Sequence, residues 1–383
     1  MSKQFVLLPD KAILEKAQGF REARYQLSNL LHEISGDKRL RWCGYGAVNN
    51  IFVRINMGLT AQGHKRAGAS GLIMCKRIWT CPVCSYKIAN QRNKDLADTF
   101  RVWKQEHGSL LFITFTLSHK RNQPLKQVWD GINNAWALML SGKSWHNFST
   151  QYGAEGFVRA TELTVGNNGW HVHYHTALFI NKGFDTPKNI EVIREYLSNR
   201  WINSLNKFDF SASASIGVDV RRTYSDSGLS KYLNKFASEL TQGHAKNAKS
   251  NNRTPFTILK EISESKDFNS NKTQRDLALW WEFEKVSKGR RQLVISKKVR
   301  ALVKLTEIDM TSDDMIISPV TIMTISAVSW YKLKQARQVT NFYNKLETQD
   351  FASVLFWLSD LGISYTLTSA QHDEKNKELF NVI

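Results

Sequence analysis

The chain has no long apolar run, no internal repeat and no glycine-rich phosphate loop. No stretch approaches the ~20 apolar residues that a membrane-spanning helix needs. Residues 1–10 hold too short an apolar run for a signal peptide. We therefore expect a cytoplasmic protein that has no membrane partner.

Acidic residues are scarce relative to basic ones. The sequence has 34 Asp and Glu against 53 Lys and Arg, which gives a formal net charge of +19. Such an excess favours a polyanionic partner, because basic side chains that neutralise phosphates release condensed counterions. The 12 Trp and 20 Phe also provide rings on which bases can stack. Nucleic acid is the expected partner, and a merely solubilising surface is the alternative.

Cysteine is also scarce, and its four occurrences lie close together: Cys43, Cys75, Cys81 and Cys84. The Cys81-Pro-Val-Cys84 knuckle is typical of tetrahedral structural zinc, and a reducing cytoplasm argues against disulfides. His64 is an alternative to Cys43 as the fourth ligand. Four unconnected buried thiols are the other interpretation. We expect a structural zinc.

Three histidines alternate in the run His171-Val172-His173-Tyr174-His175, which leads into an apolar stretch at 176–180. Alternate residues of a β-strand point to the same face, so the three imidazoles would stack along one side. Imidazole is the commonest metal ligand in proteins, and the pattern therefore predicts a divalent-cation site. Half-exposed histidines that hold no ion are the alternative.

The middle of the chain predicts an alternation of strands and helices. Strands are expected at 110–117, 157–165, 170–180 and 216–220, with helices at 126–140 and 189–205. This β-α-β-β-α-β order is typical of a ferredoxin-like antiparallel α+β sheet, in which the third strand is central. Helices would then cover the face opposite the histidines. Another α+β sheet with different connections is the alternative.

The register of the predicted hairpin decides whether a carboxylate joins the histidines. A two-residue turn within 166–169 places Glu162 opposite His173 or His175 and on their face, whereas a three-residue loop places it on the other face. We favour the two-residue turn, because Asn and Gly accept the positive φ that it requires.

Three domains are expected. Residues 1–106 would form a helical and zinc-binding module, with helices at 11–35 and from 86 to about 103 and an irregular segment at 40–84. Residues 107–243 would carry the sheet, and residues 244–383 a basic, mostly helical accessory region. Within the last region, 285–304 has eight basic residues and no acid, and includes Arg290 and Arg291 as candidate phosphate-binding side chains. A solvated basic face is the alternative.

A tyrosine lies among lysines on a possible helix at 226–240. Tyr232 follows Lys231, and Lys235 is one turn further on its own side. A tyrosine in this setting can be a nucleophile whose phosphate product is held by cations. Helical periodicity alone favours a packing role for Tyr232.

Taken together, these segments resemble the replication initiators of rolling-circle bacterial plasmids and related phages, which belong to the HUH endonuclease superfamily. Residues 112–117 resemble the first motif, 169–175 the second and 231–235 the third. The cysteine segment is similar to a zinc region that precedes the nuclease in some initiators, and 288–293 is similar to a run downstream of it. The resemblance covers roughly residues 40–300.

The resemblance implies an HUH nuclease core and a mechanism. His173 and His175 match the paired histidines, with His171 and Glu162 as further ligand candidates for a Mg or Mn ion that polarises the scissile phosphate. Tyr232 would attack single-stranded or hairpin origin DNA, leaving a 5′-phosphotyrosine link and a 3′-hydroxyl that primes host polymerase. A host helicase is a further implied partner, and the bacterial cytoplasm is the implied location.

One position departs from the family pattern. Some single-tyrosine initiators have a glutamate one turn before the tyrosine, where this chain has Gly228. Asp226, a second protein copy or a second nucleophile at Tyr224 are the alternatives for termination. Two other functions also remain: a small relaxase or transposase of the same superfamily, and a non-catalytic zinc-containing regulator that binds nucleic acid. The absence of a helicase phosphate loop disfavours a large relaxase.

Overall fold

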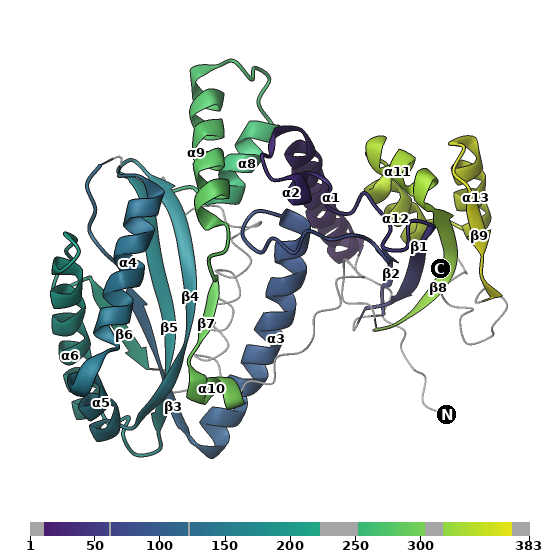
Figure 1. Ribbon diagram of the computed structural model, residues 1–383. Coiled ribbons are helices and arrows are strands. Elements are labelled where there is room, and N and C mark those ends of the chain that lie inside the picture. The colour runs from purple at the N-terminus through teal and green to yellow at the C-terminus, as the bar shows by residue number, and fades with distance from the viewer. Residues whose placement is uncertain (1–10, 61–62, 122, 223–251, 303–316, 370–383) are drawn as a thin grey trace, which may run out of the picture. The chain divides into compact units, whose positions relative to one another are not determined.

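The structure is a computed structural model that describes residues 11–60, 63–121, 123–222, 252–302 and 317–369 (Figure 1). The chain divides into two compact units. Unit 1 comprises residues 1–87 and 308–383, and unit 2 comprises residues 88–307. These boundaries differ from the expected segments 1–106, 107–243 and 244–383, which stay a prediction. Within the described ranges, no helix is both long and apolar enough to cross a membrane.

Unit 2 is built on a five-stranded antiparallel sheet. Its elements follow one another as β3 (Gly108–Phe115), α4 (Leu125–Met139), α5 (Gly142–Gln151), β4 (Ala154–Gly166), β5 (Gly169–Asn181), α6 (Pro187–Asn206) and β6 (Val218–Arg222). With β7 (Leu293–Ile295), the order across the sheet is β6-β3-β5-β4-β7, and every neighbouring pair is antiparallel. The predicted antiparallel α+β class is confirmed, and β5 is central.

Helices α4 and α6 cover one face of this sheet (Figure 1). The ring of Phe115 lies 5.3 Å from Trp136 of α4 and 5.2 Å from Trp201 of α6, in edge-to-face contacts. Tyr174 of β5 points to the same side, 5.6 Å from Trp136. Because residues alternate along β5, the histidines on either side of Tyr174 face the other way, as the sequence predicted.

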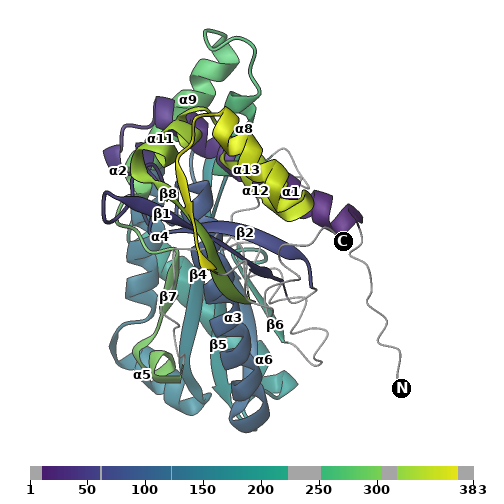
Figure 2. The same cartoon turned by 90° about the vertical axis from the view of Figure 1, so that its right-hand side faces the viewer.

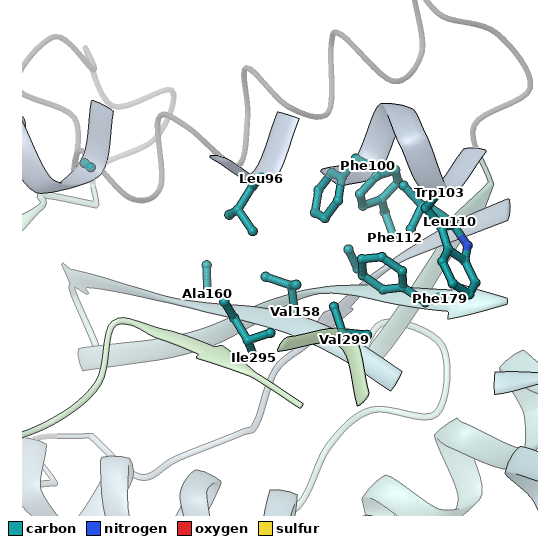
Figure 3. Close-up of a cluster of buried hydrophobic side chains, with 12 residues drawn as sticks. Leu96, Phe100, Trp103, Leu110, Phe112, Val158, Ala160, Phe179, Ile295 and Val299 are labelled. Atoms are coloured by element: carbon teal, nitrogen blue, oxygen red, sulfur yellow. The ribbon is translucent and has the colours of Figure 1, made fainter. Parts of the chain in front are cut away.

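The opposite face is partly covered by α3 (Pro82–Glu106) and α10 (Lys297–Leu302). Phe100 and Trp103 of α3 pack 5.7 and 5.2 Å from Phe179 of β5 (Figure 3). Phe179 shares its face with the histidines, being four residues beyond His175. An apolar core therefore covers one end of this face and the histidines lie toward the other end, an arrangement that the sequence did not indicate.

Two further helices support the hairpin end of the sheet: α8 (Pro255–Ser263) and α9 (Asn271–Ser287). Glu282 of α9 accepts hydrogen bonds from the indole Nε1 of buried Trp170 and from the backbone amide of Leu125, both at 2.7 Å. One carboxylate thus connects α9 to the start of β5 and to the first turn of α4.

Unit 1 is built on a four-stranded antiparallel sheet (Figure 2). Its order is β2 (Lys65–Ser70), β1 (Phe52–Leu59), β8 (Ile317–Ser326) and β9 (Tyr365–Leu367). Its helices are α1 (Lys11–Ile34), α2 (Lys38–Arg41), α11 (Ala327–Gln335), α12 (Val339–Thr348) and α13 (Phe351–Asp360).

Two expectations about unit 1 need correction. Residues 40–84 are not irregular throughout, because they contain the β1–β2 hairpin, in which Val53, Ile55 and Met57 alternate into the core. Residues 317–326 form a strand, β8, beside β1. The interruption of β1 by Arg54 and Gly58 and the large chain separation of the two strands hid this pairing in the sequence.

Candidate metal sites and nucleic-acid interface

The four cysteines converge in unit 1. Cys43 follows α2, Cys75 lies in the loop after β2, and Cys81 and Cys84 flank the start of α3. Their Sγ atoms are 3.5 Å apart for Cys43 and Cys84, and 3.6 Å apart for Cys75–Cys84 and Cys43–Cys81. In the part of the chain that the structure describes, they are the one group of potential ligands whose atoms all lie within 4.8 Å of one another.

These distances fit a tetrahedral zinc. A zinc–sulfur distance of about 2.3 Å places neighbouring sulfurs about 3.8 Å apart, far beyond the ~2.05 Å of a disulfide. Backbone amides of Cys75, Arg77 and Cys84 donate to the sulfurs at 3.4 Å, which stabilises thiolate charge. Hydrogen bonds from the other three thiols, of which that from Cys75 contributes most, hold the pKa of Cys43 well below its usual value. The alternative ligand His64 is not part of the group.

The histidine face of unit 2 is set by the hairpin register. Gly166 pairs with Gly169, so the turn has the two residues Asn167 and Asn168, and Glu162 lies directly opposite His173. The predicted two-residue turn is confirmed. The expected positive φ within the turn is wrong, because neither Asn167 nor Asn168 has one; Gly169, the first residue after the turn, has a φ of 96°.

Glu162 and two histidines form the centre of this face. The Nε2 atom of His175 donates to the Glu162 carboxylate at 2.9 Å, and the Nδ1 atom of His173 lies 3.8 Å from the same oxygen. Thr114 Oγ1 lies 3.2 Å from Nδ1 of His175 and fixes the ring from the neighbouring strand. Only 4% of the His175 side chain is exposed, against 29% for His173 and 18% for Glu162.

The donor set suits a divalent cation. Two imidazoles and one carboxylate project from adjacent strands of a rigid sheet, and the partial exposure of His173 and Glu162 gives solvent access to them. Among the described residues, this set is not one whose ligand atoms all lie within 4.8 Å of one another, as the four sulfurs do. Zinc, manganese and magnesium all accept members of such a set.

His171 has a partner that the sequence analysis missed. The Nε2 atom of His119, just beyond β3, lies 3.0 Å from Nδ1 of His171. His119 Nδ1 lies 3.1 Å from the Lys120 carbonyl, which can only accept, so His119 Nε2 accepts from His171. The His171 Nε2 atom is then left with its lone pair. Burial, followed by the charges of His119 and His173, lowers the pKa of His171 to about 4. His119 lies within four residues of the end of the first motif, residues 112–117, and this position is the one sequence feature from which its role could have been predicted.

The two candidate phosphate-binding arginines differ in their surroundings. Arg290 donates from Nη2 to Asp130 of α4 at 2.5 Å, and its guanidinium lies 4.8 Å over the ring of Trp129. Its charge is therefore offset within unit 2. Arg291 is exposed. A DNA-binding role of either residue stays a prediction.

The candidate nucleophile lies outside the described residues. Tyr232, Lys231 and Lys235 belong to the range 223–251, as do Tyr224, Asp226 and Gly228. Strand β6, which directly precedes this range, pairs with β3 beside the histidine strand β5.

Comparison with known proteins gives a family match. The family model of a replication protein matches residues 69–337, more than half of the chain. Protein rep of Streptomyces lividans is 25% identical over 307 residues, which cover 64% of this chain and 67% of that protein. Protein rep of Lentilactobacillus hilgardii is 23% identical over 235 residues, covering 60% of this chain and 66% of that protein.

A neomycin resistance protein of Streptomyces cyanogenus is 30% identical over 146 residues, which cover only 32% of this chain and 33% of that protein. The chain thus spans about two thirds of the two rep proteins and one third of this relative. No solved structure matches the chain.

Proposed function

The chain belongs to the replication protein family, as its motifs indicated, and on that premise we propose that it initiates rolling-circle replication by nicking and rejoining single-stranded origin DNA. The observation that carries the proposal is the joint placement of Glu162, His173 and His175 on one face of the central hairpin. The order of the elements in unit 2 and its strand order support the interpretation of its sheet as a ferredoxin-like HUH core.

We propose two metal sites with different roles, one on the histidine face and one at the four cysteines. Glu162, His173 and His175, with His171 beside them, would hold a Mg or Mn ion, which when bound polarises the scissile phosphate. Thr114 orients the His175 ring through Nδ1, which leaves Nε2 beside Glu162 for the ion, and His119 orients His171. The four cysteines would hold a structural zinc.

Tyr232 is the proposed nucleophile. Its phenolic oxygen attacks the scissile phosphorus and forms a 5′-phosphotyrosine bond, while the bond to the 3′ oxygen breaks. That oxygen takes a proton and leaves as the 3′-hydroxyl, from which host polymerase can extend. Lys231 and Lys235 hold the phosphate charge, and a later attack by a 3′-hydroxyl on the phosphotyrosine rejoins the strand. We further propose that the DNA substrate includes origin hairpins, that a host helicase is a partner, and that the protein acts in the bacterial cytoplasm.

Covalent capture of DNA tests the proposal. Labelled single-stranded oligonucleotides that tile the DNA around the gene are incubated with the protein and Mn²⁺, and the products are separated on a denaturing gel. A shifted band that is absent for Tyr232→Phe and retained for the matched control Tyr224→Phe is the expected result. Binding without any covalent band across the whole set would instead favour the non-catalytic regulator.

The metal assignment has its own variants. His173→Ala combined with His175→Ala should abolish the band. Glu162→Gln should lower the apparent affinity for Mn²⁺ roughly 10- to 100-fold, since it removes the carboxylate between the two histidines. Full metal-dependent nicking by the double variant would refute the assignment.

A further inference from the structure

Unit 1 carries a cluster of aromatic rings that the nicking reaction does not use. Trp42 and Tyr331 lie with ring centroids 6.4 Å apart and planes 20° apart. Tyr45 contacts both edge to face, at 5.5 and 6.0 Å, and His32 stacks on Tyr45 at 4.4 Å. The rings come from α1, from the loop after α2 and from α11. We call these four residues the aromatic cluster.

The cluster combines exposed rings with a buried support. Trp42 is 45% exposed and Tyr331 is 39% exposed, whereas Tyr45 is 6% exposed. Large rings seldom remain this accessible side by side unless a partner covers them. The two exposed rings are close to parallel, which is the orientation in which planar bases could extend the stack.

Hydrogen bonds fix the cluster in place. The indole of buried Trp330 donates to the Gly44 carbonyl at 2.9 Å, which ties α11 to the loop that carries Trp42. Arg41 Nε donates to the His32 carbonyl at 3.0 Å, and the Arg41 carbonyl lies 2.9 Å from His32 Nδ1. Trp42 also directly precedes Cys43 of the four-cysteine group. A ring held in this way loses little entropy when a ligand stacks on it.

The charges around the cluster are mostly basic. Exposed Lys38, Arg39 and Arg41 of α2 directly precede Trp42, and exposed Lys332 follows Tyr331. The two acidic side chains close in sequence are already paired, Asp37 with Arg77 and Glu33 with Arg337. The surroundings therefore favour a partner that is both planar and negatively charged.

We infer that the aromatic cluster is a binding site for single-stranded DNA, separate from the histidine face of unit 2. Bases stack on Trp42 and Tyr331, and the phosphates contact Arg39 on one side and Lys332 on the other. Every base has a planar face, so the site binds without strong sequence preference. Duplex DNA does not satisfy it, because its bases are already stacked inside the helix.

The test measures binding rather than nicking, so a failure of the nicking proposal leaves it intact. The full chain is titrated into fluorescent oligothymidine and into a duplex of equal length, and fluorescence anisotropy is recorded. Trp42→Ala and Tyr331→Ala should each weaken single-strand binding about fivefold to a hundredfold and leave duplex binding unchanged. Phe356→Ala, which removes a ring that is 77% exposed on α13 of the same unit, is the matched control and should bind as the unsubstituted protein does.

Salt dependence separates stacking from charge. Arg39→Ala and Lys332→Ala should each lower the slope of log affinity against log salt by about 0.7, whereas Trp42→Phe should leave the slope unchanged and keep most of the affinity. Because Trp42 adjoins a cysteine ligand, zinc content is measured for every variant. Tyr331→Ala, which lies far from the cysteines in sequence, gives the answer if Trp42→Ala does not fold.

Two results would overturn the inference. The first concerns two folded variants, Tyr331→Ala and the double variant Trp42→Phe with Tyr331→Ala. If both bind single-stranded DNA with an affinity within twofold of the unsubstituted protein, the cluster is not the binding site. The second is unchanged DNA binding by these variants together with a loss of self-association in sedimentation, which would make the cluster a protein-docking surface.

Discussion

Replacement of Glu347 by alanine should selectively destabilise unit 1. Glu347 lies on α12, and its carboxylate accepts hydrogen bonds from both Nη atoms of Arg21 at 2.6 and 2.8 Å. Arg66 Nη1 and the backbone amide of Ala67 also donate to it, at 3.2 and 2.9 Å. The side chains of Arg21 and Glu347 are both 0% exposed. One carboxylate thus joins the C-terminal part of unit 1 to α1 and β2.

The magnitude follows from this burial. Removing the carboxylate takes away the charge that offsets a buried guanidinium, which typically costs about 3–5 kcal/mol. The matched control is Glu33→Ala, because Glu33 pairs with Arg337 between similar segments but both side chains are more than half exposed. An exposed pair of this kind contributes about 1 kcal/mol or less.

Cysteine accessibility in urea measures the effect in unit 1 alone, since all four buried cysteines belong to that unit. With a urea dependence of about 2 kcal/mol per molar, a loss of about 4 kcal/mol lowers the midpoint of thiol exposure by about 2 M. Glu33→Ala should shift it by less than about 0.5 M. Equal shifts for the two variants would refute the reasoning.

Two further predictions concern the metal and the histidine sites. Chelation of zinc should make the four thiols react with a thiol reagent in native buffer and should lower helicity, whereas thiols that stay unreactive after complete zinc removal would contradict a structural zinc. The pKa of His171 is about 4 in the folded chain and 6.5 ordinarily, so the unfolded chain binds more protons between these values. Stability of unit 2 should therefore fall as the pH drops from about 6.5 to 4 and stay unaffected above that window. His171→Asn should flatten this decline in urea titrations at several pH values, and an unchanged slope would argue against a neutral, half-buried His171.

Much of the sheet in unit 2 could be predicted because local patterns and tertiary structure agree there. The spacing of Leu111, Ile113 and Phe115 in β3 and of Val128, Ile132 and Trp136 in α4 matches the residues that these two elements bury. The short Gly-Asn-Asn-Gly turn fixed the register, and the register placed Glu162 opposite His173.

The remaining features depend on contacts between distant segments. The pairing of β1 with β8 and the ion pair of Arg21 with Glu347 join residues more than 250 positions apart, and no local period reports such a contact. His119 escaped notice because a single histidine after a strand has no periodicity of its own. Its role emerged only when the register of β3 against β5 brought it beside His171.

Identification of the residue that becomes linked to DNA tests the central claim most directly. The covalent product formed with Mn²⁺ is digested with nuclease and trypsin, and the nucleotide-bearing peptide is sequenced by mass spectrometry. Cleavage after Lys231 and Lys235 separates Tyr232 from Tyr224, so the two tyrosines fall in different peptides. The account predicts a phosphonucleotide on Tyr232 that disappears when His173 and His175 are both replaced by alanine. A nucleotide on any other residue, or no linked peptide from a nicked oligonucleotide, would contradict it.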